Sequence, residues 1–188
     1  MSPSPIATYE RMDHSTAEDW AAQEHYRPSC IATLPDRLMS MLTSLDGKFD
    51  GSPISAYAHS LQSATLAHED GADDQTVFCA LFHDVGQWVS EDNHSEVSAA
   101  IVRPFVSERL YWIVKHHGLF QGYFYFHHIG QDRNAREAYR DSPHYQACID
   151  WCDRYDQRAF RRDYPTRPLE FFEPMVRRVI AGRSQPSA

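Results

Sequence analysis

Apolar positions along most of the chain recur at the spacing of amphipathic helices. From Leu34 onward they fall at Leu38, Met41, Leu42 and Leu45, an i, i+3, i+4, i+7 pattern that predicts one apolar helical face. The sequence has no internal repeat and no sustained alternation of apolar and polar residues, which is the pattern of half-buried strands. The pattern therefore predicts an all-α fold.

Capping residues and breakers divide the rest of the chain. A glycine-bearing loop is expected at residues 46–51. Prolines and small polar residues mark favoured helix starts, and glycines or prolines mark the ends. The further helices predicted in this way span residues 53–71, 73–88, 93–104, 107–118, 142–160 and 169–181. Between them, residues 119–130 are densely aromatic, and the polar residues 133–140 predict a short exposed helix.

Length and composition indicate one globular domain. A chain of 188 residues can bury a sizeable core, and its 42% of hydrophobic residues is close to the globular average. Residues 1–30 are polar and contain prolines, so we expect an arm wrapped over the domain. The prediction is an N-terminal arm at residues 1–30, a single helical bundle at residues 31–182, and a flexible tail at residues 183–188.

The sequence also limits compartment and partners. No apolar run approaches the ~20 residues that cross a bilayer, and the N-terminal residues 1–5 lack the features of a signal peptide. We therefore expect a cytoplasmic protein, monomeric or homodimeric, with no membrane partner. The net charge of −8 argues against a general nucleic-acid surface.

The four cysteines form no CxxC pair. Cys148 and Cys152 are spaced i, i+4 and would share one helical face, which allows a zinc pair. Their apolar neighbours favour buried thiols instead.

The doublet His83-Asp84 carries the strongest chemical signal. It ends the apolar run Phe78–Phe82, and burying a charge without a partner is costly. Adjacent side chains on a helix point about 100° apart, so the two cannot stack on one face. Both can reach a centre off the helix axis, where the carboxylate bridges two metals and the imidazole holds one. The doublet predicts a metal site.

Further histidines and an aspartate extend this site. Singly, His59, His94, the His116-His117 pair and Asp156 each have an ordinary interpretation as a hydrogen-bonded, surface or ion-paired residue. Together with the doublet, they form an ordered set of imidazoles and carboxylates carried on consecutive predicted helices. Such a set suits two transition metals that share one carboxylate, and it favours iron, zinc or manganese over calcium or magnesium.

This ordered set resembles HD-domain proteins, which are helical metalloproteins, and His94 and His117 match the dinuclear subgroup. Within that subgroup the chain is most similar to the phosphonate-cleaving mixed-valent diiron oxygenases, the PhnZ-like group, distantly related to myo-inositol oxygenase. The resemblance covers roughly residues 38–160. It is carried by His59-Ser60-Leu61-Gln62, Ala80-Leu81-Phe82-His83-Asp84-Val85-Gly86, the stretch Ser107-Glu108-Arg109 to His117, and Tyr155-Asp156.

The resemblance implies a ligand set for two iron ions in the Fe2+/Fe3+ states, with Mn2+ or Zn2+ as the alternative metals. One iron would take His59, His83, Asp84 and Asp156. The other would take His94, His117 and the bridging Asp84. The catalytic residues implied are His83, Asp84 and His94. Two choices stay open, because His116 could replace His117 and Asp153 could replace Asp156.

The resemblance implies a non-haem diiron dioxygenase. Such an enzyme would oxidatively cleave a C–P or C–C bond of a small anionic, hydroxylated substrate such as a hydroxyphosphonate, with dioxygen as its partner. The alternative is a metal-dependent phosphohydrolase acting on a nucleotide or phosphate ester. Many HD hydrolases follow the doublet with glycine and lysine, and here Gln87 follows Gly86, which favours the oxygenase. A third hypothesis is a non-catalytic HD module that acts as a sensor or scaffold.

Four residues are candidates for substrate binding. Phosphonate-cleaving relatives carry an aromatic residue and an acid in the loop before the first ligand. Here Phe49 and Ser52 stand in their places, so Asp50 is the candidate for a substrate amine. Gln121 stands where a lysine is expected, and it follows the ligand candidates closely. Tyr123 is also near them, and Arg133 could turn inward to hold an anion. We expect Arg136 and Arg140 to be surface charges paired with Asp132, Glu137 and Asp141.

Overall fold

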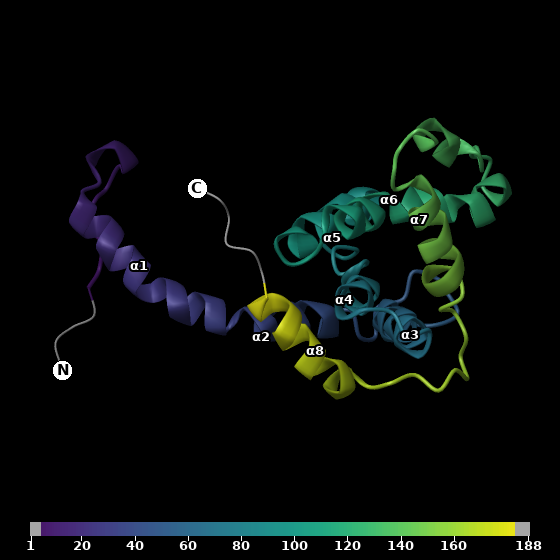
Figure 1. Cartoon of the computed structure of the whole chain (residues 1–188), viewed down its shortest axis with the longest axis horizontal. Coiled ribbons are helices and arrows are strands. Elements are labelled where there is room, and N and C mark those ends of the chain that lie inside the picture. The colour runs from purple at the N-terminus through teal and green to yellow at the C-terminus, as the bar shows by residue number, and fades with distance from the viewer. Residues whose placement is uncertain (1–4, 183–188) are drawn as a thin grey trace. The chain divides into compact units, whose positions relative to one another are not determined.

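The computed structural model describes residues 5–182, which form two compact units, residues 5–39 and residues 40–182. Helix α1 (Ala17–Ala32) lies in the first unit, and α2 (Leu34–Thr43) crosses the boundary. The second unit contains the remaining helices, which Figure 1 labels. They are α3 (Ala56–Glu69), α4 (Asp74–Phe82), α5 (His94–Val102), α6 (Glu108–Tyr125), α7 (Tyr145–Trp151) and α8 (Leu169–Ala181).

The described residues contain no strand, which confirms the predicted all-α class. Short 3-10 segments lie at Met12–His14, Glu91–Asn93, Arg103–Phe105, Phe126–His128 and Ala135–Tyr139, and a π-helical turn covers Cys152–Asp156. Among residues 5–182, no helix is both long enough and apolar enough to cross a bilayer. The predicted tail at residues 183–188 lies outside the described residues.

The first unit contains a helix where the sequence predicted only an arm. α1 starts at a capping box: the Thr16 hydroxyl accepts from the Asp19 amide, and the Asp19 carboxylate accepts from the Thr16 amide at 2.9 Å. The amide of Thr8 donates to Asp19 at 2.7 Å, and this hydrogen bond, followed by that of Thr16, lowers the pKa of Asp19. The proline-bearing composition concealed the helix, since Pro28 lies inside it.

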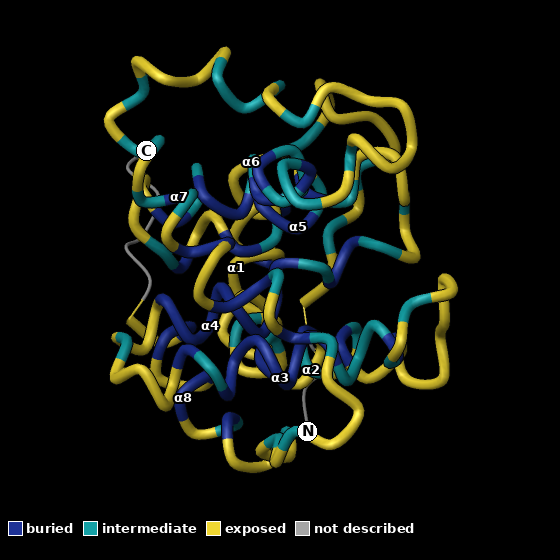
Figure 2. Tube along the Cα trace, turned by 90° about the vertical axis from the view of Figure 1, so that its right-hand side faces the viewer, coloured by how far each residue is buried: buried dark blue, intermediate teal, exposed yellow. Residues whose placement is uncertain are grey.

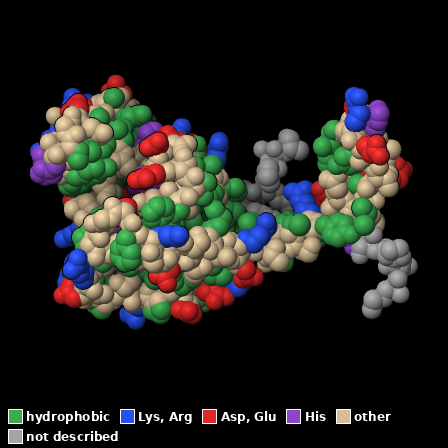
Figure 3. All heavy atoms as spheres, turned by 180° about the vertical axis from the view of Figure 1, so that it is seen from behind, with side chains coloured by type: hydrophobic (Ala, Val, Ile, Leu, Met, Phe, Trp, Pro, Cys, Tyr) green, Lys and Arg blue, Asp and Glu red, His purple; other side chains and the backbone are tan. Residues whose placement is uncertain are grey.

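The core of the second unit is built on α3 and α4. The two helices pack against each other, α8 covers α4, and α5 packs along α6. Figure 2 shows buried backbone concentrated in these helices and exposed backbone in the connecting loops. α4 is buried from Thr76 to Phe82, and α3 is buried from His59 to Thr65. On the face that Figure 3 shows, the basic and acidic side chains of this unit are intermixed.

Several predicted helix ends were wrong. α3 begins at Ala56, where Ser55 accepts from the Ala58 amide, so Pro53 lies outside it. α4 ends at Phe82 rather than near Trp88, because a run of tight turns follows. α6 continues through Gly118, which has ordinary helical backbone, to Tyr125. The predicted helix at residues 142–160 is α7 followed by the π-helical turn.

Candidate metal centre

Six side chains from five separate segments of the second unit meet at one point. α3 and α6 contribute their interior residues, α5 its first residue, the turn after α4 two adjacent residues, and the π-helical turn its last residue. These residues are His59, His83, Asp84, His94, His117 and Asp156. Four of them are buried, whereas the side chains of Asp84 and His94 are 14% and 26% exposed.

The doublet lies at the end of α4, not within it. His83 is the C-cap residue of the helix, and the amides of Val85 and Gln87 donate to the carbonyls of Phe82 and Asp84 in the following turns. Gly86 allows this turn to approach α5, because a Cβ there would lie 2.7 Å from a methyl carbon of Val97. The helix end therefore frees Asp84 to reach the centre alongside its neighbour.

Every imidazole in the centre is oriented by a backbone carbonyl. Because a carbonyl can only accept, each Nδ1 carries a proton, and in the neutral ring the lone pair of Nε2 then points inward. Carbonyl partners of this kind are typical of metal-binding histidines. The Nδ1-to-oxygen distances are 2.9 Å for His59 to Ala159, 2.9 Å for His83 to Ala80, 2.8 Å for His94 to Glu91, and 2.7 Å for His117 to Val114.

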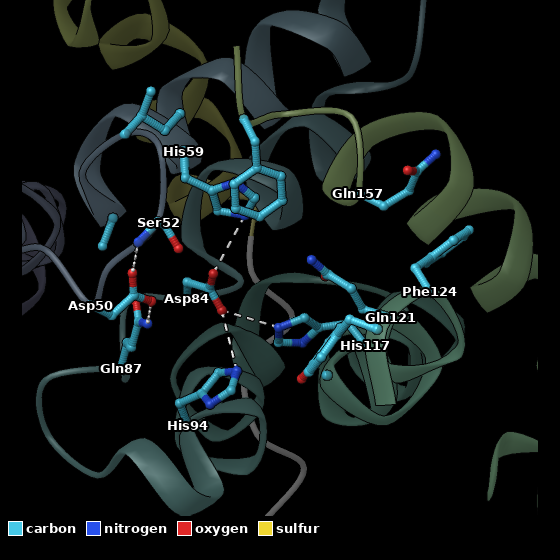
Figure 4. A pocket seen from close by; sticks show the side chains of 15 residues that line it. Asp50, Ser52, His59, Asp84, Gln87, His94, His117, Gln121, Phe124 and Gln157 are labelled. Atoms are coloured by element: carbon cyan, nitrogen blue, oxygen red, sulfur yellow. Dashed lines mark hydrogen bonds and ion pairs between the residues drawn. The ribbon is translucent and has the colours of Figure 1, made fainter. Parts of the chain in front are cut away.

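Asp84 lies between two pairs of histidines. Its Oδ2 is 3.5 Å from Nε2 of His59 and 3.3 Å from Nε2 of His83. Its Oδ1 is 3.4 Å from Nε2 of His94 and 3.1 Å from Nε2 of His117. Figure 4 shows the carboxylate at the middle of the labelled histidines. Each carboxylate oxygen thus serves one side, which is the geometry of a bridging ligand.

Polar groups in this centre lack ordinary partners. Both oxygens of Asp156 are buried and accept no hydrogen bond, although its Oδ1 lies 3.2 Å from Nε2 of His59. The Nε2 atoms of His59 and His83 are only 3.1 Å apart. Two Nε2 atoms and a carboxylate facing one another are unfavourable unless an added proton or a metal cation lies among them. The donor set therefore fits a metal ion.

The pKa values of three groups reflect the same arrangement. Burial opposes ionisation of Asp84 and Asp156, but the positive charge of His83 outweighs it, so the pKa of each carboxyl is held well below its usual range. For His83, burial favours the neutral ring, yet the charges of Asp84 and Asp156 raise its pKa well above the usual value. The centre attracts positive charge, which a bound metal would supply.

Two overlapping groups of ligand atoms lie close enough to hold an ion. One comprises His59, His83 and Asp156, and the other comprises His83, Asp84 and His117. His94 joins the second group through its 3.4 Å approach to Asp84. The described residues place no cysteine in either group. Cys148 and Cys152 are buried thiols whose sulfurs face the carbonyls of Ile113 and His117.

The structure separates the two residue choices that the sequence left open. His116 stacks on Trp112 with ring centroids 4.0 Å apart, and its Nδ1 donates to the Trp112 carbonyl, whereas His117 faces the centre. Asp153 is exposed and accepts from the side chain of Gln157, whereas Asp156 is buried in the centre. Because α6 continues past Gly118, both histidines lie inside a helix and not at its C-terminus.

A pocket of about 490 Å³ opens onto the centre. Among its lining residues are the ligand candidates His59, Asp84, His94 and His117. The others are Asp50, Ser52, Ile54, Ala56, Gln87, Gly118, Gln121, Phe124, Tyr125, Gln157 and Phe160. Its lining contains two carboxylates and no lysine or arginine.

The predicted substrate residues divide into two groups. Asp50 and Gln121 line the pocket, on opposite sides of Asp84 in Figure 4. Tyr123 and Arg133 do not line it, and instead Arg133 stacks over the Tyr123 ring, with Cζ 4.3 Å from the centroid. Tyr123 is two residues from Gln121, a rotation of about 200° on a helix, so it faces away from the pocket.

Sequence reasoning missed several pocket residues. Tyr125 lies four residues after Gln121, which itself lies four after His117, so one face of α6 carries all three from the metal centre outward. That spacing was visible, but the helix was expected to end at Gly118. Burial, followed by the charges of Asp156 and Asp84, raises the pKa of Tyr125, so its hydroxyl stays a hydrogen-bond donor. Gln157 and Phe160 gave no sequence signal.

Comparison with known protein families matches residues 56–158 to the HD domain. The chain belongs to the HD-domain family. The matched segment begins at α3 and ends just beyond the π-helical turn, so it contains all six clustered residues of this HD domain. Members of the family bind divalent metals, and this HD domain has a His/Asp cluster that fits them.

One curated relative within reach of sequence comparison is a phosphonate dioxygenase. The HD-domain chain is 25% identical over 166 residues to the 1-hydroxy-2-(trimethylamino)ethylphosphonate dioxygenase (glycine-betaine-forming) of Leisingera caerulea. The alignment covers 72% of this chain and 84% of that protein. The expected resemblance to phosphonate-cleaving oxygenases is confirmed at this level of similarity.

Proposed function

We propose that this HD domain is a diiron oxygenase that oxidatively cleaves a C–P or C–C bond of a small anionic, hydroxylated substrate. The observation that carries the proposal is the position of Asp84, with each oxygen facing a separate pair of histidines beside an open pocket. Two irons in the Fe2+/Fe3+ states would supply substrate chelation and activation of dioxygen. His59, His83, Asp84 and Asp156 would hold one iron, and His94, His117 and Asp84 the other.

The charge of the pocket favours a zwitterionic substrate. Since no lysine or arginine of the described residues lines the pocket, an anionic group of the substrate has to bind at the metals. Asp50 is the other charged residue of the lining, and a carboxylate there favours a cationic group. The curated relative acts on a phosphonate that carries a trimethylamino group. We therefore infer a substrate with an anionic group, a hydroxyl and a cationic group.

Asp50 is held in position by two donors. The Ser52 amide donates to its Oδ1 at 2.9 Å, and the Gln87 side chain donates to its Oδ2 at 3.2 Å. Gln87 is neutral, so it orients the carboxylate without cancelling its charge. A lysine at this position, as in many HD hydrolases, would form an ion pair with Asp50. Gln87 thus supports both a cation site at Asp50 and the oxygenase over the phosphohydrolase.

Other residues suit substrate orientation. The carboxamide of Gln121 points toward the centre in Figure 4 and has no hydrogen-bond partner among the described residues, so it can bind a substrate oxygen. Tyr125 can donate from the same face of α6. Phe160 stacks on the His59 ring, with centroids 4.5 Å apart, and Phe124 contributes a second aromatic side chain to the pocket lining.

Dioxygen consumption with matched substrates tests this proposal. The iron-loaded protein is expected to consume dioxygen and release phosphate with 1-hydroxy-2-(trimethylamino)ethylphosphonate, and to consume none when the hydroxyl is absent. Removing the trimethylamino group should raise KM in the wild type but have little further effect in Asp50→Asn. Asp46→Asn, in the same loop but outside the pocket lining, is the control. Hydrolysis of a phosphate ester without dioxygen uptake would favour the phosphohydrolase.

A further inference from the structure

Arg133, predicted to bind substrate, belongs to a separate cluster on the other side of α6. Its Cζ lies 4.3 Å from the centroid of the Tyr123 ring, and the Cζ of Arg136 lies 3.7 Å from the same centroid. Tyr123 is on α6, whereas the two arginines come from the segment that includes the 3-10 helix Ala135–Tyr139. None of the three residues lines the metal pocket.

These two guanidinium groups lack a fixed counter-charge. The Nε atoms of both arginines are buried and have no hydrogen-bond acceptor. Within the described chain, no carboxylate lies within 4.0 Å of Arg133, and the nearest to Arg136 is Glu137, at that limiting distance. The side chain of Arg136 is only 12% exposed. This differs from the predicted surface pairing of Arg136 with a neighbouring acid.

Glu137 is already engaged elsewhere. Its Oε1 accepts from the Tyr145 hydroxyl at 2.6 Å, and its Oε2 accepts from Nε of Arg140 at 3.1 Å. These hydrogen bonds and the adjacent arginines keep the pKa of Glu137 below its usual value. The carboxylate is therefore occupied by Arg140, and Arg136 receives only a weak share of its charge.

A shared aromatic ring does not compensate for two half-buried cations. Each guanidinium gains from the Tyr123 ring, but the two positive charges repel each other, and their Nε–H groups remain without acceptors. An oxyanion bound to the terminal guanidinium nitrogens would supply the missing counter-charge, because guanidinium groups donate in a fork that matches phosphate oxygens. We propose that Arg133 and Arg136, on the Tyr123 platform, form a binding site for a tetrahedral oxyanion such as a phosphate or phosphonate group.

Calorimetric titration of the metal-loaded, full-length protein with inorganic phosphate tests the site. The metal centre can also take phosphate, so the comparison is between the wild type and the double variant Arg133→Gln/Arg136→Gln. The double variant is expected to lose one saturable binding event and to keep the event at the metals. A parallel titration with phenyl phosphate distinguishes a free phosphate ion from an esterified phosphate group, according to which binds more tightly.

Arg161→Gln is the matched control. Arg161 also lies over a tyrosine, with Cζ 5.1 Å from the Tyr164 centroid, but its side chain is exposed and has Asp163 at 3.9 Å. This control should titrate like the wild type. If the double glutamine variant does not fold, Arg133→Lys/Arg136→Lys keeps both charges and loses the planar fork, and about tenfold weaker phosphate binding is expected. Phosphate isotherms identical to the wild type in a folded double variant would overturn the proposal.

Discussion

At the scale of single residues, Asp84 decides whether the centre is one site or two. His59 and His83 approach one of its oxygens, and His94 and His117 approach the other. A mononuclear site would leave one of these pairs without a role. The bridging geometry, more than the presence of histidines, is the reason to expect two metals.

Substituting His94 separates the two metal positions. His94 faces only the Oδ1 side of Asp84, so His94→Ala should lose about one of two metal equivalents and keep the other. Metal analysis of the purified variant measures this. His116→Ala is the neighbouring-histidine control and should keep both, because its ring stacks on Trp112. An unchanged metal content in His94→Ala would refute the second position.

Substituting Asp84 should affect both positions together. Asp84→Asn keeps the size of the side chain but removes the charge that faces all four histidines, so affinity should fall for both metals. The stoichiometry after dialysis against dilute metal measures the loss. Asp153→Asn, an exposed aspartate near the other carboxylate ligand candidate, should behave as the wild type. If Asp84→Asn lost only one metal, the bridge would be wrong.

At the scale of elements, the ligands are set by how closely the helices approach. Gly118 on α6 faces α5, where a Cβ would lie 2.8 Å from the Ser95 hydroxyl and 3.6 Å from ring atoms of His94. Gly118→Ala should therefore shift the start of α5 and reduce metal occupancy on the His94 side. Removing the obstructing hydroxyl in Gly118→Ala/Ser95→Ala should restore it. Metal analysis of the single and double variants checks this, and full occupancy in Gly118→Ala would contradict it.

The side-chain amide of Gln62 helps to fix the segment after the π-helical turn to α3. Gln62 donates from Nε2 to the Arg161 carbonyl at 2.9 Å and accepts from the Arg161 amide at 2.9 Å. The same segment holds the Ala159 carbonyl that orients His59. Gln62→Leu removes both hydrogen bonds and leaves part-buried backbone groups of Arg161 without these partners, so the free energy of unfolding should fall by about 1–3 kcal/mol.

Chemical denaturation measures that loss. Gln146→Leu is the control, because Gln146 is exposed and bonds only the neighbouring Asp150 side chain among the described residues. Its stability should stay within about 0.5 kcal/mol of the wild type. Equal stabilities for the two variants would show that the hydrogen bonds between Gln62 and Arg161 do not fix the segment after the π-helical turn.

The sequence predicted the bounds of a helix well where its apolar pattern and terminating residues agree with its packing in the fold. α8 has the predicted bounds, since its apolar face packs on α4 and Gly182 follows it. The end of α4 could not be predicted, because the turn at Gly86 depends on the approach of Val97 from α5. The π-helical turn that places Asp156 likewise has no distinctive sequence pattern.

At the scale of the whole molecule, the second unit is organised around unpaired polar groups that a metal would satisfy. Metal removal by a chelator should therefore lower Tm, because the Asp156 carboxylate and the inward nitrogens then face one another without a cation. Added metal at about 100 times its Kd should stabilise the fold by about 2.7 kcal/mol. Thermal denaturation with and without metal measures this, and an unchanged Tm would indicate a centre that does not bind metal.

Sequence and structure contribute differently to the functional argument. The order of histidines and aspartates on five predicted helices, together with the resemblance to HD-domain proteins, anticipated the six residues that meet, while His116 and Asp153 stayed open as alternatives. The choice of pocket residues depended on helix phase, so Gln121 lies in the pocket while Tyr123 and Arg133 face away. Which side chains of α6 point into the pocket depends on where the helix ends and how it packs, and composition does not reveal either.

The most direct test of the central claim is electron paramagnetic resonance of the anaerobically purified, partly reduced protein, together with metal analysis. The account predicts two irons per chain and a coupled Fe(II)/Fe(III) signal that changes when a hydroxyphosphonate is added. Isolated mononuclear signals, or zinc or manganese accompanied by phosphatase turnover, would contradict it.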